Sequence, residues 1–345
     1  MAHFEIKNLS FSYPTAGGRK ALDDINLTIE RGQYVTFCGR SGCGKTTLLR
    51  QLKSALAPHG KRTGEILFDG TPIGDVGLRE QSARIGYVMQ DPDNQIVTDK
   101  VWHELAFGLE SLGVDQKTIR LRVAEMASYF GIQGWFHKKV TELSGGQKQL
   151  LNLASIMAMQ PDVLILDEPT SQLDPIAASD FLNTVRKINR ELRTTVLITE
   201  HRLEDIFHAS DLVVVMEDGK VLTADGPRQV GAFLKEKDSP IFAAMPSPVQ
   251  IYFAVMNTNG DILKKQSEKD EASKKGFEES EGTEGNSGMA YADGCPLTVR
   301  EGAAWLDTLF EGKKLEKTVI EDADPALADP EDIEDPAVFV KETWF

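Results

Sequence analysis

The chain has 345 residues, 41% hydrophobic and 26% charged, which is ordinary for a soluble protein with a sizeable core. No stretch reaches the roughly 18 consecutive apolar residues of a membrane span, and the N-terminus lacks a signal-peptide pattern, so we expect any membrane link through a partner. The net charge is −15, and residues 246–345 hold 22 acidic and 10 basic residues. Without a basic patch, nucleic acid is not an expected partner.

Residues 1–245 alternate short apolar runs with longer helical stretches, which predicts an α/β fold. Buried parallel strands are expected at Val35–Cys38, Val163–Leu166, Thr195–Thr199 and Leu212–Met216. Shorter runs predict an edge antiparallel subdomain from Phe4–Leu9, Ile25–Ile29, Glu65–Phe68 and Val221–Thr223. Helices are expected at Thr46–Ala57, Lys100–Leu112, Gln116–Phe130, Leu143–Met159 and Ile176–Leu192.

The character of the chain changes after residue 245. Ile251–Val255 is a short apolar island, and Asn257–Asn286 is rich in Lys, Glu, Ser and Gly, which predicts disorder. Pro296–Phe310 predicts a short amphipathic helix, and Glu321–Asp335 predicts an extended acidic spacer. We therefore expect an acidic, partly disordered linker over residues 246–336.

A glycine-rich segment between a predicted strand and a predicted helix has the context of a phosphate-binding loop. It reads Gly39, Arg40, Ser41, Gly42, Cys43, Gly44, Lys45 and Thr46, followed by Thr47. Glycines at both ends let backbone N–H groups turn inward around a phosphate. Lys45 would supply a cation to the β and γ oxygens, and the Thr46 hydroxyl would coordinate Mg²⁺. The segment alone predicts a nucleotide-binding site.

Two further features gain meaning from that loop. Asp167 and Glu168 close an apolar strand. Alone they would be a solvated strand end, but after a phosphate loop they suit Mg²⁺ and an attacking water. Ser144, Gly145 and Gly146 open a helix, where a helix N-terminus attracts anions, although Ser144 can also be a simple N-cap.

Together these motifs resemble the ATP-binding cassette (ABC) ATPases. The turn that is similar to the family signature consists of Leu143, Ser144, Gly145, Gly146 and Gln147. The resemblance implies a P-loop NTPase with a RecA-like parallel sheet, an antiparallel β subdomain and a helical subdomain over about 91–160. It also implies that the turn contacts the γ-phosphate held by a second cassette, that Asp167 holds the metal, and that Glu168 is the general base.

Four single residues match family positions. The resemblance implies that Gln90 reaches Mg²⁺ and the water, that His201 contacts the γ-phosphate, and that Tyr13 stacks on adenine. Asp174 matches the loop that couples the two sites, although Gln172 replaces the small residue usual there. Taken alone, these residues would be read as a surface Gln, a structural His and a strand-end Tyr.

Four segments are similar to the energy-coupling factor (ECF) group of transporters. They are Asp91–Val97, Ala106–Glu110, Thr199–Glu204 and Cys295–Gly302. The resemblance implies an ATPase at the cytoplasmic face of the membrane that drives uptake of a vitamin, vitamin precursor or metal ion. Its partners would be a transmembrane coupling subunit and a substrate-binding membrane subunit. The alternatives are the ATPase of another ABC importer or exporter, and a soluble cassette acting on nucleic acid or ribosomes.

Two expectations concern partners. The surface around Gln95–Leu109 should form a groove for a helix of a membrane subunit. Its apolar residues are expected mainly in the core (Val101, Trp102, Leu105 and Leu109), and its exposed polar residues should make the contact (Gln95, Asp99 and His103). The sequence of Val338–Phe345 is similar to that of Phe4–Phe11. The similarity is either a coincidence between two strands, or residues 337–345 are the first strand of a second cassette. The second cassette could thus belong to another copy of this chain, to a different chain, or to the same natural chain.

Overall fold

The computed structural model describes residues 2–14, 17–200, 203–256, 292 and 294–310. The described residues up to Gly302 belong to one compact unit, and those from Ala303 to Phe310 belong to a second. The expectations for 257–286, 321–335 and 337–345, and for His201, lie outside the described residues. No helix in the described part is long and apolar enough to cross a membrane.

The elements follow one another in the order predicted for an α/β protein. The strands are β1 (Ala2–Ser12), β2 (Leu22–Glu30), β3 (Tyr34–Cys38), β4 (Lys61–Phe68), β5 (Thr71–Pro72), β6 (Ile85–Val88), β7 (Val163–Asp167), β8 (Thr195–Thr199), β9 (Leu212–Glu217) and β10 (Lys220–Asp225). The α-helices include α1 (Lys45–Gln51), α2 (Leu78–Arg84), α3 (Val101–Ser111), α4 (Gln116–Tyr129), α5 (Gly145–Ala158), α6 (Pro175–Leu192), α7 (Pro227–Glu236) and α9 (Val299–Phe310).

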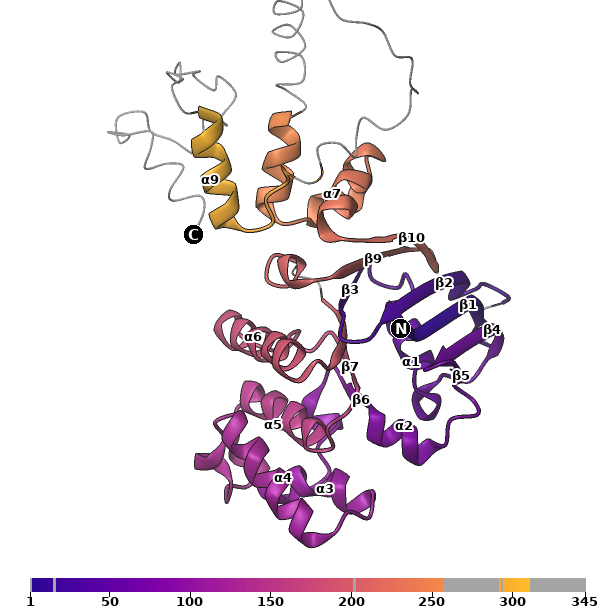
Figure 1. Cartoon of the computed structure of the whole chain (residues 1–345). Coiled ribbons are helices and arrows are strands. Elements are labelled where there is room, and N and C mark those ends of the chain that lie inside the picture. Colours follow the sequence, from indigo (N-terminus) through magenta and orange to yellow (C-terminus); the bar gives the residue numbers. More distant parts are fainter. Residues whose placement is uncertain (1, 15–16, 201–202, 257–291, 293, 311–345) are drawn as a thin grey trace, which may run out of the picture. The chain divides into compact units, whose positions relative to one another are not determined.

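The strands form two sheets (Figure 1). The first is antiparallel, in the order β2-β1-β4-β5, and the second has the order β10-β9-β3-β8-β7-β6 with only β10 antiparallel to its neighbour. The placement of Val221–Thr223 in the antiparallel subdomain was therefore wrong. Asp218 and Gly219 both have positive φ, 45° and 81°, and this two-residue turn folds β10 back onto β9.

The helix predicted at Thr46–Ala57 ends earlier, at Gln51. The buried side chain of Gln81 explains this difference, because its Oε1 accepts a hydrogen bond from the Ser54 backbone N–H at 2.9 Å. Its amide nitrogen donates to the carbonyl oxygens of Ile73 and Val76 at 2.9 and 2.7 Å. Such long-range bonds compete with continuation of the helix, and Ser54–Leu56 forms only a 3₁₀ turn.

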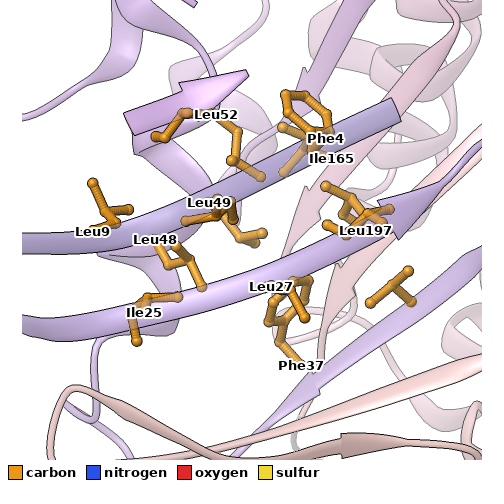
Figure 2. Packing of buried hydrophobic residues seen from close by; sticks show 14 of the residues in the cluster. Phe4, Leu9, Ile25, Leu27, Phe37, Leu48, Leu49, Leu52, Ile165 and Leu197 are labelled. Carbon is orange, nitrogen blue, oxygen red and sulfur yellow. The ribbon is translucent and has the colours of Figure 1, made fainter. Parts of the chain in front are cut away.

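Helix α1 carries the apolar core between the two sheets (Figure 2). Leu48 and Leu49 of α1, with Leu52 directly after the helix, belong to this core. The antiparallel sheet contributes residues that include Phe4, Leu9, Ile25 and Leu27, and the parallel sheet contributes Phe37, Ile165 and Leu197. Truncating one such buried Leu to Ala typically costs about 2–5 kcal/mol. The helix that follows the phosphate loop is thus fixed by packing on two sides.

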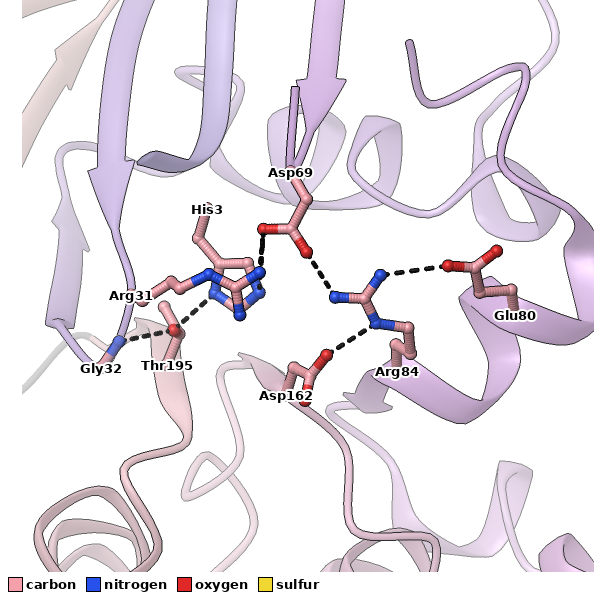
Figure 3. A network of polar contacts seen from close by, with 8 residues as sticks. All are labelled: His3, Arg31, Gly32, Asp69, Glu80, Arg84, Asp162 and Thr195. Carbon is pink, nitrogen blue, oxygen red and sulfur yellow. Dashed lines mark hydrogen bonds and ion pairs between the residues drawn. The ribbon is translucent and has the colours of Figure 1, made fainter. Parts of the chain in front are cut away.

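A polar network also joins the two sheets (Figure 3). The Arg84 guanidinium pairs with Asp69, with Asp162 at 2.6 Å and with Glu80 at 3.0 Å. Asp69 also pairs with Arg31 at 2.5 Å. Because Asp69 follows β4 and Asp162 precedes β7, the network connects the antiparallel sheet to the parallel one.

Two groups of helices complete the first unit. Helices α3, α4 and α5 pack on one another, with α5 against β6. Residues 247–256 form a helix whose Val249 lies against Gly231 of α7. The Arg228 guanidinium of α7 donates to the Cys295 carbonyl at 2.8 Å. The helix predicted at Pro296–Phe310 begins at Val299.

Candidate functional site

Most of the predicted site residues that the structure describes lie where the parallel strands end. The phosphate loop links β3 to α1, Asp167 ends β7, and Gln90 lies two residues beyond β6. In open α/β sheets, ligands bind outside the carboxyl ends of the strands.

Backbone shape defines the phosphate loop. Gly39 and Gly44 have φ of 144° and 106°, and a Cβ on them would lie 2.1 Å from the Met216 carbonyl oxygen and 2.6 Å from that of Ala21. Only glycine fits at these two positions. The Lys45 ammonium is buried beneath the loop and donates to the carbonyl oxygens of Gly39 and Arg40 at 2.9 and 3.3 Å.

The rest of the loop divides into an exposed tip and a buried base. Arg40, Ser41 and Gly42 are exposed, whereas Cys43 is buried, and burial raises the pKa of its thiol. The Thr47 hydroxyl lies 3.1 Å from the Tyr13 hydroxyl, whose ring packs edge-on against Phe11. Tyr13 is therefore held beside the start of α1.

Asp167 is the centre of the polar cluster below the loop. Its side chain is buried, and its Oδ1 accepts from the hydroxyls of Thr46 at 2.9 Å and Thr199 at 3.0 Å. Its Oδ2 accepts from the Tyr87 hydroxyl at 3.1 Å. The phosphate-loop hydroxyl and the strand-end carboxylate, predicted separately, are thus in direct contact.

Glu168 and Gln90 lie beside this cluster. Glu168 has a left-handed backbone with φ of 50°, and its N–H donates to the Thr199 hydroxyl oxygen at 2.9 Å. The Gln90 amide nitrogen donates to Glu168 Oε2 at 3.2 Å. The strained backbone turns the Glu168 side chain out of the strand direction, toward the exposed Gln90.

The turn Leu143–Gln147 forms the start of α5. Ser144 Oγ accepts from the Gln147 N–H at 3.3 Å, and Gln147 Oε1 accepts from the Ser144 N–H at 3.0 Å. This capping box means that the simple N-cap interpretation of Ser144 holds in the structure. A Cβ on Gly146 would lie 3.2 Å from the Cβ of Ala177, so the turn borders the start of α6.

Asp174 caps α6. Its Oδ1 accepts from the N–H groups of Ile176 at 3.1 Å and Ala177 at 2.9 Å. His201 lies outside the described residues. Its neighbour Glu200 is buried, and Glu200 Oε1 accepts from the Thr170 hydroxyl at 2.7 Å.

Comparison with known proteins identifies the family of this chain. The sequence model of the ABC transporter family matches residues 22–171. An ABC transporter ATP-binding protein from Methanosarcina mazei is 37% identical over 226 residues, which cover 66% of this chain and 68% of that protein. This chain belongs to the ABC transporter family.

Relatives of this cassette include longer proteins. One from Bacillus anthracis, named as an ABC transporter ATP-binding protein, is 45% identical over 248 residues, which cover 71% of this chain but 45% of the relative. The chain spans less than half the length of such curated relatives. The solved structure of cbiO1 from Clostridium perfringens, part of the ABC transporter complex cbiONQ, is 31% identical with a TM-score of 0.61, covering 72% of this chain and 98% of that one. A dimeric cassette bound to ADP and Pi, at 24% identity and a TM-score of 0.58, covers 65% and 98% and supports the fold.

Gln149, which joins the segments around the site, was not predicted from the sequence. The buried amide of Gln149 donates to the carbonyl oxygens of Met89 at 3.3 Å and Pro169 at 3.0 Å, joining the segments that follow β6 and β7. Gln95 was expected to be exposed for a partner, which was wrong. It is half-buried, accepts from the Met89 N–H and donates to the Tyr87 carbonyl, both at 2.9 Å. The sequence carried no signal for the role of Gln149, because its two contacts lie 60 and 20 residues away along the chain.

The donor set of the cassette fits Mg²⁺. Thr46 and Asp167 offer oxygen atoms, and Gln90 offers an amide oxygen nearby. Among the residues whose placement is described, no group of three His, Cys, Asp or Glu could hold a metal alone. Mg²⁺ is commonly bound by one or two carboxylates together with nucleotide phosphates and water, so this sparse oxygen set suits it.

Proposed function

We propose that this chain is the ATP-hydrolysing cassette of an ABC transporter of the ECF type. The observation that carries the ATPase assignment is the contact chain from Thr46 through Asp167 to Glu168 and Gln90. It places a phosphate-loop hydroxyl, a buried carboxylate and a second, less buried carboxylate at one edge of the sheet. ATP hydrolysis needs these three kinds of group.

Each group has one task in the proposed reaction. The loop N–H groups and Lys45 bind and orient the β- and γ-phosphates. Thr46 and Asp167 would hold Mg²⁺, which neutralises phosphate charge when bound. Glu168 accepts the proton of the attacking water, and Gln90, already bonded to Glu168, orients that carboxylate. Tyr13 would stack on adenine.

The turn Leu143–Gln147 and Asp174 are proposed to complete the site of a second cassette. Support comes from the surface beside them: Gly146 borders Ala177, and the neighbouring Ile176 is 77% exposed. An exposed Ile in the first turn of a helix, beside a glycine turn, is the kind of apolar anchor that an interface covers. Closure of two cassettes on ATP, and reopening after hydrolysis, would be a population switch driven by differential ligand binding.

The catalytic assignment is tested with Glu168→Gln. The variant keeps the size of the side chain but cannot take a proton, so we expect hydrolysis to be lost while ATP binding survives and cassette association tightens. Glu125→Gln, at an exposed position of α4, is the matched control and should behave as wild type. An unchanged rate of phosphate release from Glu168→Gln would refute the assignment.

A groove beside α3 supports the link to a membrane subunit. A cavity of about 540 Å³ is lined by apolar side chains that include Leu78, Val97, Phe107 and Met159. The side chains of Val97 and Leu78 are 66% and 62% exposed. A groove with apolar walls receives the apolar face of a helix. The similarity to cbiO1, which is part of the ABC transporter complex cbiONQ, favours the ECF type.

The groove is tested by co-purification from detergent-solubilised membranes of cells that express the chain with the products of neighbouring genes. Val97→Asp should lose an apolar membrane subunit, because the partner helix would bury an unpaired charge. Leu121→Asp is the control, since Leu121 is 59% exposed on α4 and does not line the groove. Equal recovery of the subunit with both variants would contradict the proposal.

A further inference from the structure

Both oxygens of the Asp167 carboxylate are held by side chains outside the phosphate loop. Tyr87 donates to Oδ2 at 3.1 Å, and Thr199 donates to Oδ1 at 3.0 Å. Tyr87 and Thr199 are themselves buried. They come from β6 and β8, the two strands that flank β7 in the sheet.

We infer that Tyr87 and Thr199 are positioning residues that fix the Asp167 carboxylate for Mg²⁺. This inference rests on the proposed function, in which Asp167 takes part in holding the metal. The two hydroxyls bind opposite oxygens of one carboxylate, so they prevent its rotation. With Asp167 fixed, the Thr46 hydroxyl keeps its proton on Oδ1 and directs its lone pairs away from the carboxylate.

Tyr87 is rigid enough for this task. Its strand pairs in register with β7, with Tyr87 opposite Ile165. Its carbonyl oxygen accepts from the Gln95 amide at 2.9 Å, which also fixes the following loop through Met89.

Thr199 performs a second task with the same oxygen atom. Its hydroxyl donates to Asp167 Oδ1 and accepts from the Glu168 N–H at 2.9 Å. One side chain therefore fixes the metal carboxylate and the backbone of the proposed general base. A hydroxyl is required, because only a group that both donates and accepts can make the two bonds.

The test measures metal binding without turnover. Mn²⁺ is titrated in the presence of saturating ADP, and free Mn²⁺ is followed by electron paramagnetic resonance. Outer-shell partners of metal ligands typically contribute 10–100-fold in affinity, so Tyr87→Phe and Thr199→Val should each raise the half-saturating Mn²⁺ concentration about tenfold. ADP affinity measured without metal should not change. Thr199→Ser keeps the hydroxyl and should restore wild-type binding.

Two controls separate the outcomes. Tyr129→Phe removes a similar tyrosine–carboxylate bond, 3.0 Å between Tyr129 of α4 and Glu191 of α6, and should bind Mn²⁺ as wild type does. Asp167→Asn should weaken Mn²⁺ binding most. If Asp167→Asn binds normally, the proposed metal site is wrong and the inference falls with it. If only Asp167→Asn is weakened, the inference alone is overturned. Melting curves identify any variant that does not fold, and the Thr199 pair then decides.

Discussion

Acidification from pH 7 to pH 5 should destabilise this cassette through His3. The His3 side chain, 1% exposed, lies in β1 and stacks on Phe68 with the ring centroids 5.2 Å apart. Its Nδ1 is 2.7 Å from the Thr195 hydroxyl, which also accepts from the Gly32 N–H at 2.9 Å. His3 Nε2 is 3.9 Å from Asp69, too far for a hydrogen bond that would stabilise a charged ring.

The magnitude follows from the pKa. Burial lowers the pKa of His3 from 6.5 to about 4, and the charge of Asp69 opposes this only in part. The unfolded chain takes up the proton as pH falls through 6.5, whereas the folded chain takes it up only near 4. Stability from the neutral ring is therefore present above pH 6.5 and lost between 6.5 and 4. The two pKa values correspond to about 2 kcal/mol lost between pH 7 and 5, and about 3 kcal/mol by pH 4.

Urea unfolding at pH 7 and pH 5 tests this value. Between these two pH values, the wild type should lose about 2 kcal/mol more free energy of unfolding than His3→Gln, which has no titrating ring. His59→Gln, at an exposed turn, is the matched control and should follow the wild type. The reasoning is refuted if wild type and His3→Gln lose equal stability, or if the folded His3 titrates near 6.5 by NMR.

Three further predictions concern the loop, the network and the second cassette. Gly44→Ala should lower the ADP affinity, and it should lower the stability by more than about 1 kcal/mol, because the added Cβ meets the Ala21 carbonyl. Gly42→Ala is the control: nothing lies within 4 Å of the added Cβ, so differential scanning calorimetry should show a smaller loss of stability. Arg84→Met removes the ion pairs of Arg84 with Asp69, Asp162 and Glu80, while Asp69 keeps its pair with Arg31, and it should cost about 1–3 kcal/mol in urea unfolding. An unchanged free energy of unfolding would contradict the network's role. ATPase activity per chain should rise with chain concentration, and a concentration-independent rate typical of an assembled transporter would contradict the two-cassette site.

The sequence predicted what depends on local pattern. Periodicity and glycine spacing located the parallel strands β3, β7, β8 and β9, the phosphate loop and the helix at Ser144, but not the parallel strand β6; the fold class is confirmed. The Asp218–Gly219 pair was an available local signal that β10 returns to β9, because Asp-Gly favours the positive φ angles of a two-residue hairpin turn, and the prediction did not use it. Local pattern could not show that Gln81 competes for the end of α1, because that contact spans 27 residues. The roles of the site residues remain predictions.

Strand order decides the part of the site that sequence reading missed. Asp167 was identified because two acids end an apolar run, but the same run does not reveal its neighbours. The order β8-β7-β6 places Thr199 directly opposite Asp167 and brings Tyr87 to its other side. Each of these residues lies shortly before a residue predicted from the family, Tyr87 three before Gln90 and Thr199 two before His201. In a parallel sheet the carboxyl ends of neighbouring strands converge, so the supports of a strand-end carboxylate should be sought near the ends of the flanking strands.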